Sequence, residues 1–118
     1  MTPEAQQIAI AKACGWKDVK YTKHEEVDIE NRSIIHWSEL TGIPPEFTHY
    51  KNRIRIPDYL NDLNAMHEAE KAMSVNDRNR YIDTLGTTYH DSWEFCTATA
   101  AQRAEAFLRT INKWETGQ

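Results

Sequence analysis

The amino-acid sequence predicts an α+β fold in which four helices form the main core and residues 19–56 form a small antiparallel sheet. Two observations carry this prediction. Near the C-terminus, Ala104, Phe107, Leu108 and Ile111 recur at helical spacing and share one face. In residues 24–30 and 49–56 polar and apolar residues alternate instead, which is typical of strands.

Capping residues bound the predicted helices. We expect these helices over residues 3–14, 57–73, 75–85 and 99–114. Thr2 predicts the start of the first helix and Gly15 its end. Thr99 and Gln102 have the spacing of a capping box at the start of the last helix. Gly86 is expected to end the third helix.

Each predicted helix is expected to bury an apolar face. For the second helix, which would begin at Pro57 or Asp58, this face consists of Tyr59, Leu60, Leu63, Met66 and Met73. For the third helix it consists of Val75, Ile82 and Leu85. For the last helix this face consists of Ala101 and Trp114 together with the four apolar residues named above.

The predicted sheet has three strands, over residues 24–30, 33–37 and 49–56, with turns at ENRS and TGIPPE between them. One face of the sheet would be apolar and the other charged. The third strand carries a basic row of His49, Lys51, Arg53 and Arg55, and the first carries an acidic row of Glu26, Asp28 and Glu30. Residues 86–96 fit either a short strand or a helix, and the strand is slightly favoured.

Length and composition favour one soluble domain over residues 1–118. No apolar run approaches the roughly 20 residues that span a bilayer, and the N-terminus lacks a secretory pattern, so we expect no membrane contact and a cytoplasmic location. A formal charge of −4 disfavours wide contact with nucleic acid. Cys14 and Cys96 are too few for a disulfide framework and are expected to be buried thiols.

Three segments, MTPEAQQIAIAKACGW, IPDYLNDLNAMHEAEKAM and TATAAQRAEAFLRTINKW, resemble a family of small uncharacterised phage and prophage proteins. That family is similar to the phage alpha-beta-alpha sandwich domains, in which helices pack with a small antiparallel sheet. The resemblance implies an accessory protein of a bacterial virus that acts in the host cytoplasm. It brings no catalytic residues with it, and residues 17–56 and 86–96 lie outside it.

The basic row is the first candidate site. Its side chains would share one face of a strand and could bind an anion or an acidic protein surface, with Trp37 and Tyr50 available for stacking. In the alternative interpretation, the acidic row neutralises the basic row within the same sheet. Trp37 and Trp93 are also candidates for an interface, where tryptophan is enriched.

The second candidate is the pair His67 and Glu70, which are one helical turn apart on the second predicted helix. Such a pair could move a proton or, with further ligands such as His90 and Asp91, hold a metal. The simpler interpretation is a mutually satisfied structural pair.

No spacing of residues forms a strong catalytic signature, so the prediction is a non-catalytic protein without cofactor or metal. We expect a phage accessory protein that binds a host protein, for example an antiviral defence component, and interferes with it. The predicted binding residues are Trp37, His49, Tyr50, Lys51, Arg53 and Arg55. Two alternatives remain: a protein that sequesters a nucleotide or second messenger, and a metal-assisted enzyme that uses His67 and Glu70.

Overall fold

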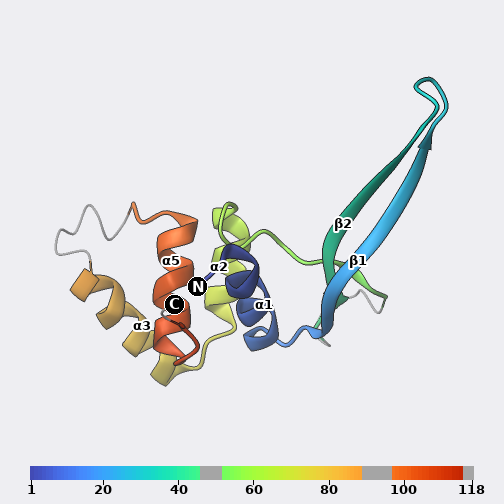
Figure 1. The fold of residues 1–118 in the computed structure, drawn as a ribbon. Coiled ribbons are helices and arrows are strands. Elements are labelled where there is room, and N and C mark those ends of the chain that lie inside the picture. Colours follow the sequence, from blue (N-terminus) through green and yellow to red (C-terminus); the bar gives the residue numbers. More distant parts are fainter. Residues whose placement is uncertain (46–51, 89–96, 116–118) are drawn as a thin grey trace. The chain divides into compact units, whose positions relative to one another are not determined.

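The computed structural model describes residues 1–45, 52–88 and 97–115 and confirms the α+β class. The chain forms two compact units (Figure 1). The helical unit comprises Met1–Cys14 and Pro57–Gln118, and the sheet unit comprises Gly15–Ile56. A single domain over residues 1–118 stays a prediction.

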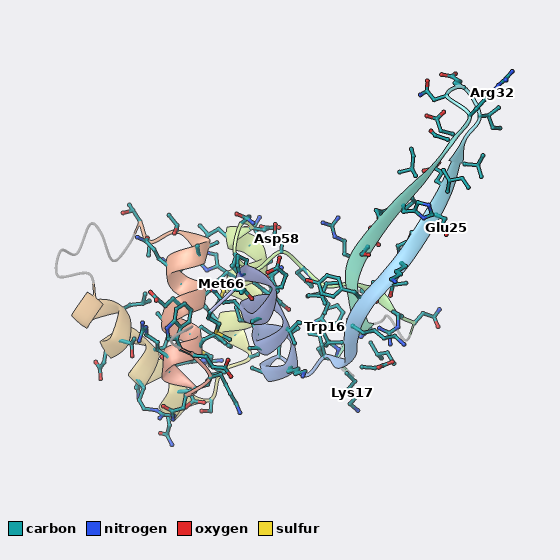
Figure 2. The ribbon with its side chains drawn as sticks, viewed as in Figure 1. Trp16, Lys17, Glu25, Arg32, Asp58 and Met66 are labelled. Carbon is teal, nitrogen blue, oxygen red and sulfur yellow. The ribbon has the colours of Figure 1, made fainter. Side chains whose placement is uncertain are left out.

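The helical unit contains α1 (Pro3–Ala13), α2 (Leu63–Lys71), α3 (Val75–Thr88) and α5 (Ala100–Thr110). Helix α5 contacts each of the other three, so its apolar stripe forms the centre of the core. The largest fully buried side chains are Ile10, Met66, Leu85, Phe107 and Leu108. Met66 is labelled in this core in Figure 2.

The predicted limits of α1 and the predicted start of α5 are confirmed by their capping contacts, whereas α5 ends at Thr110, four residues before its predicted end. The Thr2 hydroxyl accepts a hydrogen bond from the Ala5 amide at 3.1 Å, and Gly15 has the left-handed φ of +96° that favours glycine. Thr99 and Gln102 form both hydrogen bonds of the capping box. In α5 the predicted stripe is correct for Phe107 and Leu108, but Ala101 is exposed.

Helix α2 begins six residues later than predicted because a turn precedes it. The Asp62 amide donates to the Asp58 carbonyl, and the Asp62 carboxylate then accepts from the amides of Asn64 and Ala65 as the N-cap. Met66 is buried as predicted, whereas Leu63 is 42% exposed. The buried face of the helix itself consists of Ala65, Met66 and Ala69.

Helix α3 continues through Gly86 to Thr88, so the predicted end at Gly86 is wrong. A glycine inside a helix costs only about 1 kcal/mol relative to alanine, which the rest of the helix can offset. Leu85 is buried as predicted, but Ile82 is exposed and Tyr81 occupies the buried face instead. Of the ambiguous segment 86–96, residues 89–96 lie outside the described residues.

The sheet unit contains β1 (Lys17–Asp28), β2 (Ser33–Ile43) and β3 (Ile54–Arg55) in the antiparallel order β1-β2-β3. The predicted turn at ENRS is confirmed at residues 29–32. Strand β2 extends to Ile43, past the point where the TGIPPE turn was predicted to begin. Strand β3 is shorter than the predicted strand over residues 49–56, and residues 49–51 lie outside the described part of the chain.

The base of the β1–β2 hairpin is closely packed at Gly42. A Cβ atom at this position would lie 3.3 Å from both the Lys17 carbonyl oxygen and the Trp16 ring, so a side chain here would push neighbouring atoms apart. The hydroxyls of Thr22 and Thr41 are hydrogen-bonded across the strands at 2.6 Å. Strand β3 pairs with β2 only here, through Thr41 and Gly42.

Candidate partner-binding surface on the hairpin

Of the predicted basic row, Arg53 is bound within its own sheet unit. Its guanidinium donates to the Asp18 carbonyl oxygen at 2.7 Å and to the Thr41 hydroxyl at 3.2 Å, and it pairs with the Asp18 carboxylate. Its side chain is only 24% exposed. Arg53 therefore holds the base of the hairpin together and offers little surface to a partner.

Of the other three members of the basic row, the structure describes one. Arg55 on β3 is exposed. His49, Tyr50 and Lys51 lie outside the described residues, so their part in a binding site stays a prediction.

The acidic row does not neutralise the basic row across the described strands, because β2 lies between β1 and β3. Glu26 and Asp28 face Ile35 and Ser33 of β2 instead. The alternative interpretation, in which these two rows pair, is therefore wrong for Arg53 and Arg55, and it stays untested for His49 and Lys51, which lie outside the described residues.

The expectation of one apolar and one charged face is also wrong for the distal hairpin, which we define as residues 25–36 and in which both faces carry exposed apolar residues. Beyond the short contact with β3, β1 and β2 continue as a two-stranded ribbon up to the turn (Figure 1). Four of its apolar residues are exposed, with exposed fractions of 47–85%: Val27, Ile29, Ile34 and Ile35. A cluster of this kind on a folded surface is typical of an interaction site.

These apolar side chains lie on both faces of the ribbon. Val27 is paired with Ile34, and residues opposite each other in a ladder share a face. Ile35 lies on the other face, together with Trp37 two residues further along β2.

Trp37 is the predicted binding residue that the structure places next to this surface. Its ring is 40% exposed and stacks on His24 with a centroid distance of 5.3 Å and an interplanar angle of 20°. The His24 Nε2 atom lies 3.4 Å from a carboxylate oxygen of Glu39. The ring is thus held in one orientation while part of it remains accessible.

The distal hairpin is acidic as well as apolar. Its carboxylates are Glu25, Glu26, Asp28 and Glu30, and its single arginine is Arg32 at the turn. Figure 2 labels Glu25 on β1 and Arg32 at the turn. Two hydrogen bonds from Asn31 lower the pKa of Asp28, so this carboxylate stays charged to more acidic pH than a free aspartate.

The second predicted candidate, His67 and Glu70, does come together. The His67 Nδ1 atom lies 3.2 Å from a Glu70 carboxylate oxygen, and the Arg103 guanidinium lies 3.6 Å from the same oxygen. Glu70 also raises the pKa of Tyr81, whose burial is the larger cause of that shift. The cluster is therefore a carboxylate shared by an imidazole and a guanidinium beside a buried phenol.

This cluster lines a cavity of about 650 Å³ in the helical unit. Its polar lining consists of His67, Glu70, Lys71, Arg78, Tyr81 and Arg103, and its apolar lining of Ile82 and Leu85. Four basic side chains and one carboxylate thus line this cavity.

Neither a metal site nor a reactive thiol is found in the described segments. No group of three or more His, Cys, Asp or Glu residues there could hold a metal ion, and the suggested ligands His90 and Asp91 fall outside them. Burial raises the pKa of the Cys14 thiol to about 11, which keeps it protonated at neutral pH, as a structural thiol would be. Cys96 lies outside the described residues. Over the same segments, no helix is long and apolar enough to cross a membrane.

No family model, curated protein or solved structure matches this chain.

Proposed function

We propose that this protein is a non-catalytic binding protein, and that the distal hairpin is the surface that a partner protein contacts. The observation that carries the proposal is the exposure of four large apolar side chains on a ribbon that is only two strands wide. Burying such residues against a partner would remove their apolar area from water, at about 25 cal/mol per Å².

The charge of the distal hairpin defines the kind of partner. Four carboxylates and one arginine surround the apolar side chains, so a complementary surface would combine an apolar pocket with lysine or arginine at its rim. Together with the resemblance to phage proteins, this favours a bacterial host protein, for example a defence component, as the target of interference.

The experiment compares two isoleucines that are equally exposed. Ile34 on the distal hairpin is 57% exposed, and Ile82 on α3 is 53% exposed. Wild-type protein, Ile34→Asp and Ile82→Asp would each be immobilised and used to retain proteins from a bacterial lysate, with mass spectrometry as the readout.

We expect a basic protein that is retained by the wild type and by Ile82→Asp and lost with Ile34→Asp. Retention that survives Ile34→Asp, or the absence of any specifically retained protein, would contradict the proposal.

A second candidate function is the capture of a small anion such as a nucleotide, supported by the basic side chains around the cavity of the helical unit. This cavity replaces the basic row of the sheet as the site for that function. A bound nucleotide would raise the melting temperature, since a ligand at 100 times its Kd stabilises the fold by about 2.7 kcal/mol. Arg78→Gln should abolish the shift across a nucleotide panel. The control is Arg80→Gln, which changes an arginine two residues further along α3 that is paired with Asp77, and this variant should retain the shift.

A further inference from the structure

The outer edge of β1 is the feature that the proposed function leaves unused. Strand β1 has twelve residues, and β2 is the only described strand that pairs with it. A two-stranded ribbon is marginally stable in water, and an unpaired strand edge is a template for pairing with another chain. Both facts favour a further strand beside β1.

We propose that this strand is β1 of a second copy, paired antiparallel about a twofold axis at His24. The proposal does not depend on the partner-binding function. It rests on the alternation of backbone groups along a strand and on the charges of β1.

The backbone restricts the register of such a pair. In an antiparallel ladder two opposed residues both point their N–H and C=O groups toward the other strand, or both point them away. Because this orientation alternates along each strand, β1 can face its own copy only if opposed residues are both odd or both even in number. The twofold axis must therefore lie at a residue that faces its own equivalent in the copy, and it cannot lie between two successive residues of the strand.

The regular part of β1 runs from Lys20 to Asp28, because its register with β2 shifts between Lys17 and Lys20. The charges of this part disfavour an axis at position 22, 23 or 25. An axis at Thr22 would place Lys20 opposite His24 and Tyr21 opposite Lys23, so no lysine of this part would face a carboxylate. An axis at position 23 would place Lys23 opposite its own equivalent, and an axis at position 25 would do the same for Glu25. Like charges directly opposite each other destabilise a sheet.

An axis at His24 places opposite charges together in two distinct pairs and places no two carboxylates or two lysines of this part opposite each other. Lys23 then faces Glu25 of the copy and Lys20 faces Asp28, and symmetry repeats each pair. The basic half of β1 thus matches its acidic half in the reverse direction, which is the pattern a symmetric antiparallel pair requires.

The same register also matches apolar residues. Tyr21 and Val27, which are 49% and 68% exposed, would face each other and cover part of each other's surface. The two ribbons would join into a continuous sheet with four strands at its centre, which removes the exposed edge of β1 in both copies.

Charge reversal tests this register. Analytical ultracentrifugation of the full chain should show a dimer that Lys23→Glu weakens about tenfold or more, because two pairs become repulsive at once. The double variant Lys23→Glu with Glu25→Lys restores both pairs and should return the Kd to within about threefold of the wild type. Lys12→Glu on α1 makes the same change in net charge outside the sheet and should leave the dimer unchanged.

A cross-link tests the axis itself. Directly opposed residues in an antiparallel pair have Cα atoms about 4.5–5.5 Å apart, which suits a disulfide. With Cys14 and Cys96 changed to serine, His24→Cys should form an intermolecular disulfide on oxidation, whereas Thr22→Cys should not.

A chain that is monomeric at every concentration would overturn the proposed dimer, as would a dimer that the charge swap does not restore or that cross-links equally well at position 22. The lysate experiment remains separate, because Ile34 lies on β2 and its substitution leaves the β1 edge intact. Loss of partner retention with Ile34→Asp in a chain that still dimerises would count for the partner surface and not against the dimer.

Discussion

Replacing Arg53 with alanine removes a guanidinium that joins β1 to β2 at the base of the hairpin. In the wild type this group donates to the Asp18 carbonyl oxygen and to the Thr41 hydroxyl, and it pairs with the Asp18 carboxylate. Asp18 has a φ of +50°, an unfavourable value for a residue other than glycine, so its conformation needs contacts that hold it.

The expected loss of stability follows from the exposure of each group. Hydrogen bonds to charged groups contribute about 1.5–3 kcal/mol when they are shielded from water. The Asp18 side chain is 57% exposed, which brings its ion pair with Arg53 down to about 0–1 kcal/mol. Thr41 is buried but keeps its hydrogen bond with Thr22. Together these contacts give about 1–2 kcal/mol for Arg53→Ala.

Hydrogen exchange measures this change where it should occur. The Ile56 amide donates to the Leu40 carbonyl beside the Arg53 contacts, and its exchange reports opening of the sheet. A loss of about 1–2 kcal/mol should accelerate this exchange about 5- to 30-fold. Arg55→Ala is the matched control, because Arg55 lies two residues further along the chain, on β3, but is exposed, and it should leave the exchange rate unchanged.

Unchanged exchange in Arg53→Ala would refute the structural role assigned to this residue. If the variant also lost its partner in the lysate experiment, Arg53 would belong to a binding surface, as the sequence predicted.

Three further substitutions test the helical unit. Thr99→Ala removes the capping box of α5 and should cost about 1 kcal/mol, seen as a fall of about 4 °C in Tm. Phe107→Ala empties a site at the centre of the core and should cost about 3–5 kcal/mol in urea unfolding, whereas a loss below 1 kcal/mol would mean that α5 is not central. In a Cys96→Ser background, iodoacetamide should label Cys14 slowly at pH 7 and faster as the pH approaches 11, because its raised pKa keeps the thiol protonated. Rapid labelling at pH 7 would contradict the raised pKa of this partly exposed thiol.

The helical part of the fold could be predicted because its signals are local. Thr2, Thr99 and Gln102 act through hydrogen bonds within one turn, and the spacing of Phe107 and Leu108 fixes the buried face of α5. The start of α2 was wrong for a similar reason, since Asp58 and Asp62 both suit an N-cap. The choice between them depends on the turn that leads into the helix.

The sheet could be predicted only in part because its register and exposure depend on other strands. Alternation in residues 24–30 identified a strand, but an alternating strand need not have anything to bury its apolar face. One signal against a single apolar face was present in the sequence: Ile34 and Ile35 are adjacent and must point to opposite faces of the strand. The contact of Arg53 with Asp18 joins residues 35 positions apart and had no local signal.

The helical unit is discontinuous in sequence, and this sets the order in which its parts become available during synthesis. Helix α1 leaves the ribosome first, but its contact with α5 needs a segment that is translated roughly 4–20 s later at 5–20 residues per second. A hairpin forms in about 1–10 μs once its strands are out. The ribbon can therefore be complete while the nascent helical core still lacks its last helix, and an arrest at the ribosome before residue 100 would leave α1 without its contact to α5.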